Sequence, residues 1–195
     1  MDGNGGGQML EAVNLQKSFD GKQVLSGFSA RFEDGGHYAL MGPSGCGKTT
    51  LLNLLMGLHK PDGGEVRMPG GTKLSAVFQE DRLLKQMTAQ ANVALVSAAS
   101  RNEIEALLME LGIDEESLLK PVGTYSGGMK RRVALCRALL AEFDVLFLDE
   151  PYKGLDVETR KRVMKIVERY TQGKTVVLVT HDREEAEGYQ MISLG

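Results

Sequence analysis

The segment GPSGCGKTT, residues 42–50, has the residue types and the spacing that bind the phosphates of a nucleoside triphosphate. Its glycines let the backbone approach a polyphosphate, and its N–H groups form an anion-binding nest at the positive end of the following helix. The ammonium of Lys48 would bind the β- and γ-phosphates, and the hydroxyl of Thr49 would ligate Mg²⁺. The candidate phosphate-binding residues are Gly42, Pro43, Ser44, Gly45, Cys46, Gly47, Lys48, Thr49 and Thr50. This loop alone predicts a protein that binds ATP or GTP, whereas a glycine-rich turn without a ligand would not explain the complete spacing.

Further polar residues stand where predicted strands end. Asp149 and Glu150 directly follow one apolar run, Gln79 ends a second and His181 ends a third. Ligands of parallel sheets bind beyond the carboxyl ends of the strands, so we expect these residues to gather at one edge. Asp149 suits a carboxylate that orients Mg²⁺, and Glu150 is placed to accept a proton from an attacking water. The alternatives are a solvated strand end for the two acids and a structural role for His181.

The strands and helices that must hold these residues alternate along the chain. Residues 10–39 have the pattern of antiparallel strands with a hairpin at Asp20-Gly21, and residues 38–41 form the strand before the loop. Buried strands are predicted at residues 74–78, 145–148 and 175–179, with helices between them. The fold class is therefore α/β, with a mostly parallel sheet that carries helices on both faces.

The chain is expected to form one domain over residues 1–195. Residues 9–79 and 144–195 make the α/β core, and residues 80–143 make an inserted helical subdomain, where Ser100 and Glu103 form a capping-box pattern. Residues 1–8 are glycine-rich and are predicted to be a flexible tail. After His181 we expect a short acidic helix and a last strand at residues 191–194.

Composition narrows the function classes. The 195 residues carry a net charge of −3, which gives no broad electrostatic reason to bind nucleic acid. No apolar run reaches the roughly 18–20 residues needed to cross a bilayer, and the start lacks the features of a signal peptide, so we expect a cytoplasmic protein. The two cysteines provide no disulfide framework.

The order of these motifs resembles that of the ATP-binding subunits of ABC transporters. GPSGCGKTT matches the first phosphate motif of the family, VLFLDE the second, and YSGGM the signature that usually reads LSGGQ. Gln79 falls at the family's glutamine that senses Mg²⁺, Asp156 ends the loop that crosses the dimer, and His181 matches the switch histidine. The similarity covers residues 10–194 and implies a P-loop NTPase core of the RecA-like type.

The resemblance also implies an ATPase that works as a dimer. Ser126, Gly127 and Gly128 precede a helix, so their amides can face a γ-phosphate, which in the family belongs to the ATP of the opposite subunit. Two copies of the chain, or the chain and a homologous ATPase subunit, would enclose two Mg-ATP. Phe19 falls where the family stacks an aromatic ring on adenine, with Val24 beside the nucleotide, although the sequence pattern alone suits a buried strand aromatic.

The segment after Gln79 is similar to importers of the nitrate, sulfonate and taurine class. It reads VFQEDRLL at residues 77–84, with Thr88 and Asn92 following. The resemblance implies a subunit on the inner face of the cell membrane that drives a separate permease, with a solute-binding protein in the complete system. Leu83 and Leu84 are the residues that we expect to contact the permease, whereas Val93 fits a packing role in the helical subdomain equally well.

The chain departs from the family pattern at three positions, and two other functions remain open. Tyr125 and Met129 replace the usual leucine and glutamine of the signature, and Lys85 stands where similar importers often have proline. A transport-independent ABC ATPase of a protein or nucleic-acid machine would carry tandem cassettes, a coiled-coil insertion or a basic face, none of which is present. An exporter subunit is the other alternative, which the importer-like segment disfavours. A generic P-loop kinase or GTPase would not explain the SGG, Asp-Glu and His181 elements together.

Overall fold

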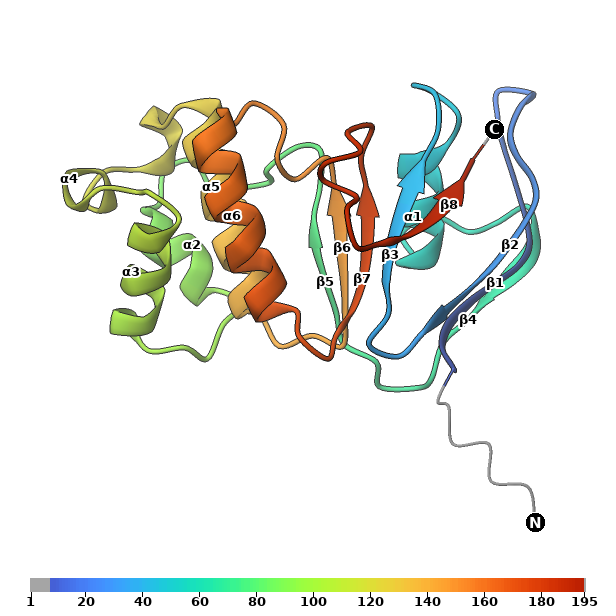
Figure 1. The fold of residues 1–195 in the computed structure, drawn as a ribbon, viewed down its shortest axis with the longest axis horizontal. Helices are drawn as coiled ribbons and strands as arrows, with labels where there is room; N and C mark the ends of the chain where they lie inside the picture. The colour runs from blue at the N-terminus through green and yellow to red at the C-terminus, as the bar shows by residue number, and fades with distance from the viewer. Residues whose placement is uncertain (1–7, 195) are drawn as a thin grey trace, which may run out of the picture.

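The computed structural model describes residues 8–194 and contains a five-stranded parallel sheet (Figure 1). Its strands lie in the order β5-β6-β7-β3-β8, and every neighbouring pair is parallel. The strands are β3 (His37–Met41), β5 (Leu74–Val77), β6 (Val145–Asp149), β7 (Thr175–Val179) and β8 (Gln190–Ser193). All residues of β6 and β7 are buried, as their continuous apolar runs predict for the middle of a parallel sheet.

A second sheet is antiparallel and has the strand order β2-β1-β4. Strands β1 (Gln8–Phe19) and β2 (Lys22–Glu33) form the predicted hairpin, in which Asp20 and Gly21 both have positive φ, 49° and 77°. The third strand, β4 (Gly63–Arg67), is not among the strands that the sequence predicts. Because the segment is short and contains two glycines, its sequence carries no clear strand pattern, and the strand depends on its pairing with β1. The predicted tail lies outside the described residues except for Gln8, which begins β1.

The helices occupy both faces of the parallel sheet and one end of the molecule (Figure 1). Helix α1 (Lys48–Leu55) follows the glycine loop, and α5 (Gly127–Leu140) and α6 (Val157–Tyr170) pack on the other face. At the far end lie α2 (Ala89–Ala94), α3 (Arg101–Glu110), α4 (Glu115–Leu118) and the 3-10 turn η1 (Val122–Thr124). Ser100 and Glu103 form the predicted capping box of α3. None of the helices in the described part of the chain is both long and apolar enough to cross a membrane.

The core consists of two apolar clusters, one on each face of the parallel sheet. Alternate residues of β6 face opposite sides, so Val145 and Phe147 pack toward α1 and the antiparallel sheet. Leu146 and Leu148 pack toward α5 and α6. The sheet is thereby fixed on both faces, which gives rigid support to the loops that follow its strands.

The short acidic helix predicted after His181 is wrong. This segment forms a series of turns, in which Arg160 pairs with Asp182 at 2.5 Å and with Glu184 at 2.9 Å. The hydroxyl of Thr180 binds the buried Glu185, and Gly188 has a φ of +80° just before β8. These side-chain contacts replace helical hydrogen bonds in a segment too short to gain much from helix propagation.

Candidate functional site

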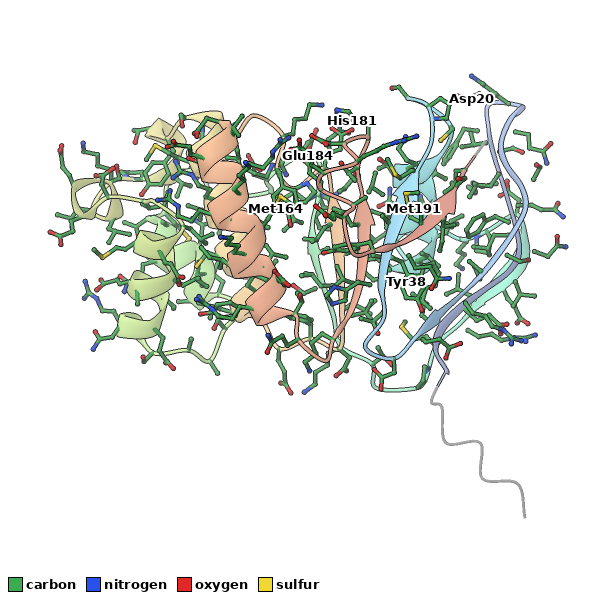
Figure 2. The ribbon with its side chains drawn as sticks, in the orientation of Figure 1. Asp20, Tyr38, Met164, His181, Glu184 and Met191 are labelled. Atoms are coloured by element: carbon green, nitrogen blue, oxygen red, sulfur yellow. The ribbon has the colours of Figure 1, made fainter. Side chains whose placement is uncertain are left out.

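A cavity of about 550 Å³ lies at the carboxyl end of the parallel sheet. It brings together the loop after β3 with residues that follow β5, β6 and β7, as the sequence predicts. His181 and the hairpin residue Asp20 both lie along the upper edge of the molecule as drawn in Figure 2. The residues that line the cavity are Val24, Gly42, Ser44, Gly45, Gly47, Lys48, Thr49, Thr50, Gln79, Asp149, Glu150, Val179 and His181. Val179, the last residue of β7, is the one lining residue that the sequence analysis missed, because an apolar strand end carries no chemical signal.

The glycine loop has a conformation that its sequence requires. Gly47 has a φ of +102°, and a Cβ atom there would lie 2.8 Å from Val24 Cγ1, so a larger residue would strain the start of α1. The Nζ atom of Lys48 donates to the carbonyl oxygens of Gly42 at 2.7 Å and Pro43 at 2.8 Å. The ammonium is therefore held over the loop, at the N-terminus of α1, where an anionic phosphate is favoured.

Thr49 and Asp149 form an oxygen-rich pair in this cavity. The Oγ1 atom of Thr49 donates to Asp149 Oδ2 at 2.9 Å, and Asp149 is 4% exposed. Burial raises the pKa of Asp149, because desolvation disfavours its charged form. A hydroxyl, a carboxylate and the nearby amide of Gln79 are the hard oxygen donors that suit Mg²⁺, and a bound cation would favour the ionised carboxylate.

Glu150 is held in a strained backbone conformation beside this pair. Its φ is +46°, which is uncommon for a residue other than glycine, and its N–H donates to Val179 O at 2.9 Å. Burial alone would raise the pKa of Glu150, but Lys153, which pairs with it at 3.0 Å, together with the charges of His181 and Lys48 lowers the pKa. His181 Nδ1 lies 3.6 Å from Glu150 Oε1. An ionised carboxylate in this position can act as a general base.

Phe19 lies outside the lining of the cavity, at the end of β1. The residue is 42% exposed, so it is not the buried strand aromatic that its local pattern alone suits. The edge of the His59 ring contacts it with a centroid distance of 5.8 Å, and Lys17 Nζ lies 5.3 Å from its centroid. Lys17 is in turn held by Asp62 at 2.7 Å. The ring therefore keeps part of its surface exposed to solvent, although Lys17 lies over it.

The signature residues do not line this cavity. Ser126 caps α5 by accepting from Met129 N at 3.2 Å, and Gly127 and Gly128 form its first turn. Asp156 caps α6 by accepting from Thr159 N at 2.9 Å, which lowers the pKa of the aspartate. Pro43 and Cys46 belong to the loop but are not among the lining residues either. Within one chain, the backbone amides of Gly127 and Gly128 in the first turn of α5 are therefore not part of the cavity.

The comparisons with known proteins agree with this geometry. The family model described as ABC transporter matches residues 25–153. A cassette solved as a dimer, in a post-hydrolysis state bound to ADP and Pi, superposes with a TM-score of 0.85 at 28% identity. The superposition covers 95% of this chain and 94% of that one.

Two curated relatives are importer subunits by name. The aliphatic sulfonates import ATP-binding protein SsuB 1 of Pseudomonas fluorescens is 42% identical over 181 residues, 91% of this chain and 69% of its own length. The spermidine/putrescine import ATP-binding protein PotA of Spiroplasma citri is 38% identical over 199 residues. This chain spans 56% of the length of that relative. The chain belongs to the ABC transporter family, of which it has the ATP-binding cassette.

Proposed function

We propose that this chain binds and hydrolyses Mg-ATP as the ATPase subunit of an ABC importer. The observation that carries the proposal is the convergence of Lys48, Thr49, Asp149 and Glu150 on one cavity at the end of the sheet. The phosphate loop supplies the anion site, and the two acids after β6 supply a metal-orienting carboxylate and a base. A kinase or GTPase with the same loop would need neither Glu150 nor the His181 segment in this cavity.

In the proposed reaction, Glu150 accepts the proton of the water that attacks the γ-phosphorus. Its lowered pKa keeps it ionised at neutral pH, and its rigid placement after β6 fixes its direction. Lys48 neutralises charge on the phosphates as it develops, and His181 stands beside the base, 3.6 Å from its carboxylate. Mg²⁺, when bound by Thr49, Asp149 and Gln79, supplies further charge neutralisation of the phosphates.

A second copy of the chain would complete each site. The amides at the positive end of α5 suit a γ-phosphate, and the residues of its first turn do not line the ATP cavity of the same chain. The dimeric relative bound to ADP and Pi supports an arrangement in which two cassettes share two nucleotides. Ser126, Gly127, Gly128 and Asp156 are the residues that we assign to that interface.

Phe19→Ala should weaken ATP binding by roughly 1–3 kcal/mol, on the scale of base–aromatic stacking. The reason is that an exposed ring, oriented by Lys17 and His59, would lose its contact with adenine. Calorimetric titration of ATP and of inorganic tripolyphosphate measures the effect, and only ATP should bind more weakly. Phe19→Tyr is the matched control and should bind both ligands normally; an equal loss for both ligands would assign Phe19 to the structure of the hairpin instead.

The partner of the cassette is proposed to be a membrane permease that docks at a groove beside α5. The groove has a volume of about 410 Å³ and is lined by Glu80, Asp81, Arg82, Leu83, Lys85, Val122 and Lys130. Leu84 adjoins it and is 50% exposed, with its backbone N–H and C=O both bound by the buried Asn92. Val93 is fully buried and packs the helical end, which excludes it as a contact. A mixed apolar and charged groove of this size suits a short helix of the permease.

Leu84→Asp should disrupt this docking while the ATPase activity of the isolated chain persists. A carboxylate would replace an exposed apolar side chain at the proposed interface, at a cost of about 1–3 kcal/mol if the position is desolvated. The measurement is co-purification with a co-expressed membrane permease of the proposed importer, together with transport of its solute. Leu119→Asp is the matched control, because Leu119 is 79% exposed and does not line the groove. Normal assembly and transport by Leu84→Asp would place the docking surface elsewhere.

The names of the two relatives cover two different solute classes. The SsuB relative imports aliphatic sulfonates and the PotA relative spermidine and putrescine. We propose import at the cytoplasmic face of the membrane, with a solute-binding protein delivering the solute to the permease.

A further inference from the structure

Two arginines of α5 hold the loop between β5 and α2 by its backbone. Arg131 donates from Nη1 to Phe78 O at 2.5 Å and from Nη2 to Gln79 O at 2.6 Å. One helical turn and a half later, Arg137 donates from Nη2 to Asp81 O at 3.0 Å and from Nη1 to Arg82 O at 2.8 Å. Four of the five carbonyl oxygens from Phe78 to Arg82 are thus bound by one helix. We call these two residues the arginine clamp.

The clamp is built from partly or fully buried charge. Arg131 is 6% exposed and lies 3.3 Å from Asp81 Oδ1, so its charge is matched by a carboxylate as well as by two carbonyls. Burial raises the pKa of Asp81, whereas the nearby arginines favour its charged form. Each guanidinium uses its rigid fork to bind two adjacent peptide groups at once. These four charge-assisted hydrogen bonds fix the position of the loop relative to α5.

The clamped loop connects three places that the proposed function uses. Gln79 lines the ATP cavity, and Asp81 and Arg82 line the docking groove. The helix that carries the clamp begins at Ser126, in the signature that would contact the nucleotide of the opposite subunit. A displacement of α5 therefore reaches both Gln79 and the groove through the same four hydrogen bonds.

We propose that Arg131 and Arg137 are positioning residues that make α5 and the loop Phe78–Arg82 move as one unit. The proposal rests on the proposed function and assigns a route between the two ATP sites of the dimer. Nucleotide of the opposite subunit, bound by the first turn of α5, shifts the helix, and the clamp moves Gln79 with it at the wall of the chain's own ATP cavity. Neither arginine touches nucleotide, so both act through the loop.

Arg132 provides a matched comparison on the same helix. It is half-buried like Arg137 and also binds backbone carbonyls, those of Gly128, Leu111 and Gly112 at 3.2, 3.0 and 2.6 Å. Its contacts stay within α5 and the turn after α3, and none reaches the loop. Arg132 therefore represents an arginine on α5 that holds Gly128 and the helical end but does not hold the loop.

The test compares Arg131→Lys, Arg137→Lys and Arg132→Lys in the 195-residue chain. Lysine keeps the charge but cannot bind two carbonyls in a fork, so the loop should lose its fixed position. We expect kcat for ATP to fall by about tenfold or more in the two clamp variants, with KM for Mg-ATP unchanged, because misplaced groups near the reaction slow turnover. Hydrogen exchange of residues 78–83 should become about tenfold faster or more in these variants, on the scale of one or two lost hydrogen bonds. Arg132→Lys should leave the exchange of residues 78–83 unchanged, although its melting temperature falls.

Different results of these measurements would contradict the role of the clamp and the proposed ATPase function. Unchanged kcat and loop exchange in both clamp variants would overturn the inference, as would equally accelerated loop exchange in Arg132→Lys. No ATP hydrolysis by the wild type would refute the proposed function, while the exchange of residues 78–83 with and without Mg-ATP still tests the clamp. Mg-ATP should then slow loop exchange in the wild type and not in the clamp variants. Arg137→Lys provides the measurement if Arg131→Lys fails to fold, since Arg137 is the less buried of the two.

Discussion

Glu150→Gln should lower ATP turnover by roughly 10²–10⁴-fold while ATP binding survives. Glutamine preserves the size of the side chain and its place after β6 but cannot accept a proton from water. The structure favours a loss of turnover without a loss of binding, because the backbone of Glu150 is fixed by the hydrogen bond from its N–H to Val179 O. With binding intact and hydrolysis slow, the variant should accumulate as an ATP-bound dimer.

Phosphate release gives the turnover of this variant, and light scattering with Mg-ATP gives its mass. Glu158→Gln, an exposed glutamate on the first turn of α6, makes the same chemical change outside the cavity and should behave as the wild type. Near-normal turnover in Glu150→Gln would remove the general-base role. Loss of binding together with turnover would instead show that the substitution disturbs the strained backbone at φ +46°.

The sequence predicts this site well because its residues follow strands. Apolar runs identify β5, β6 and β7, and the carboxyl ends of parallel strands share one edge, so the positions of Gln79, Glu150 and His181 follow from chain order alone. The hairpin at Asp20-Gly21 is predicted for a similar reason, since it depends on local backbone preferences. Such features need no knowledge of long-range packing.

Features that depend on distant partners were not predictable in this way. Strand β4 depends on its pairing with β1. The acidic segment after His181 forms turns because Arg160 of helix α6 binds its carboxylates. The arginine clamp has no sequence signal either, because its acceptors are backbone carbonyls that any residue provides. The exposure of Phe19 likewise required the packing of the hairpin, since an alternating pattern gives no measure of how far a strand end projects.

Lys48→Ala should reduce the affinity for Mg-ATP on the order of 100-fold, within the range measured when one partner of a buried charge pair is truncated. The loop amides and the start of α1 would remain, but they would face a polyphosphate without the ammonium that Gly42 O and Pro43 O hold in place. At an ATP concentration about a hundredfold above its dissociation constant, the wild type should gain about 2.7 kcal/mol of stability. The same concentration should give the variant only about 0.4 kcal/mol by the same relation.

A thermal-shift titration measures both values, and the unliganded melting temperatures must be compared first. The two hydrogen bonds of Lys48 to its own loop contribute to the fold without nucleotide, so Lys48→Ala should start slightly less stable. The nucleotide-dependent shift is therefore the informative quantity, because it subtracts that difference. Lys161→Ala, on the exposed face of α6, controls for the loss of a surface charge and should show the full shift. Equal Mg-ATP stabilisation of Lys48→Ala and Lys161→Ala would contradict the assignment of the loop as the phosphate site, since no other group in the cavity lining offers an ammonium to the phosphates.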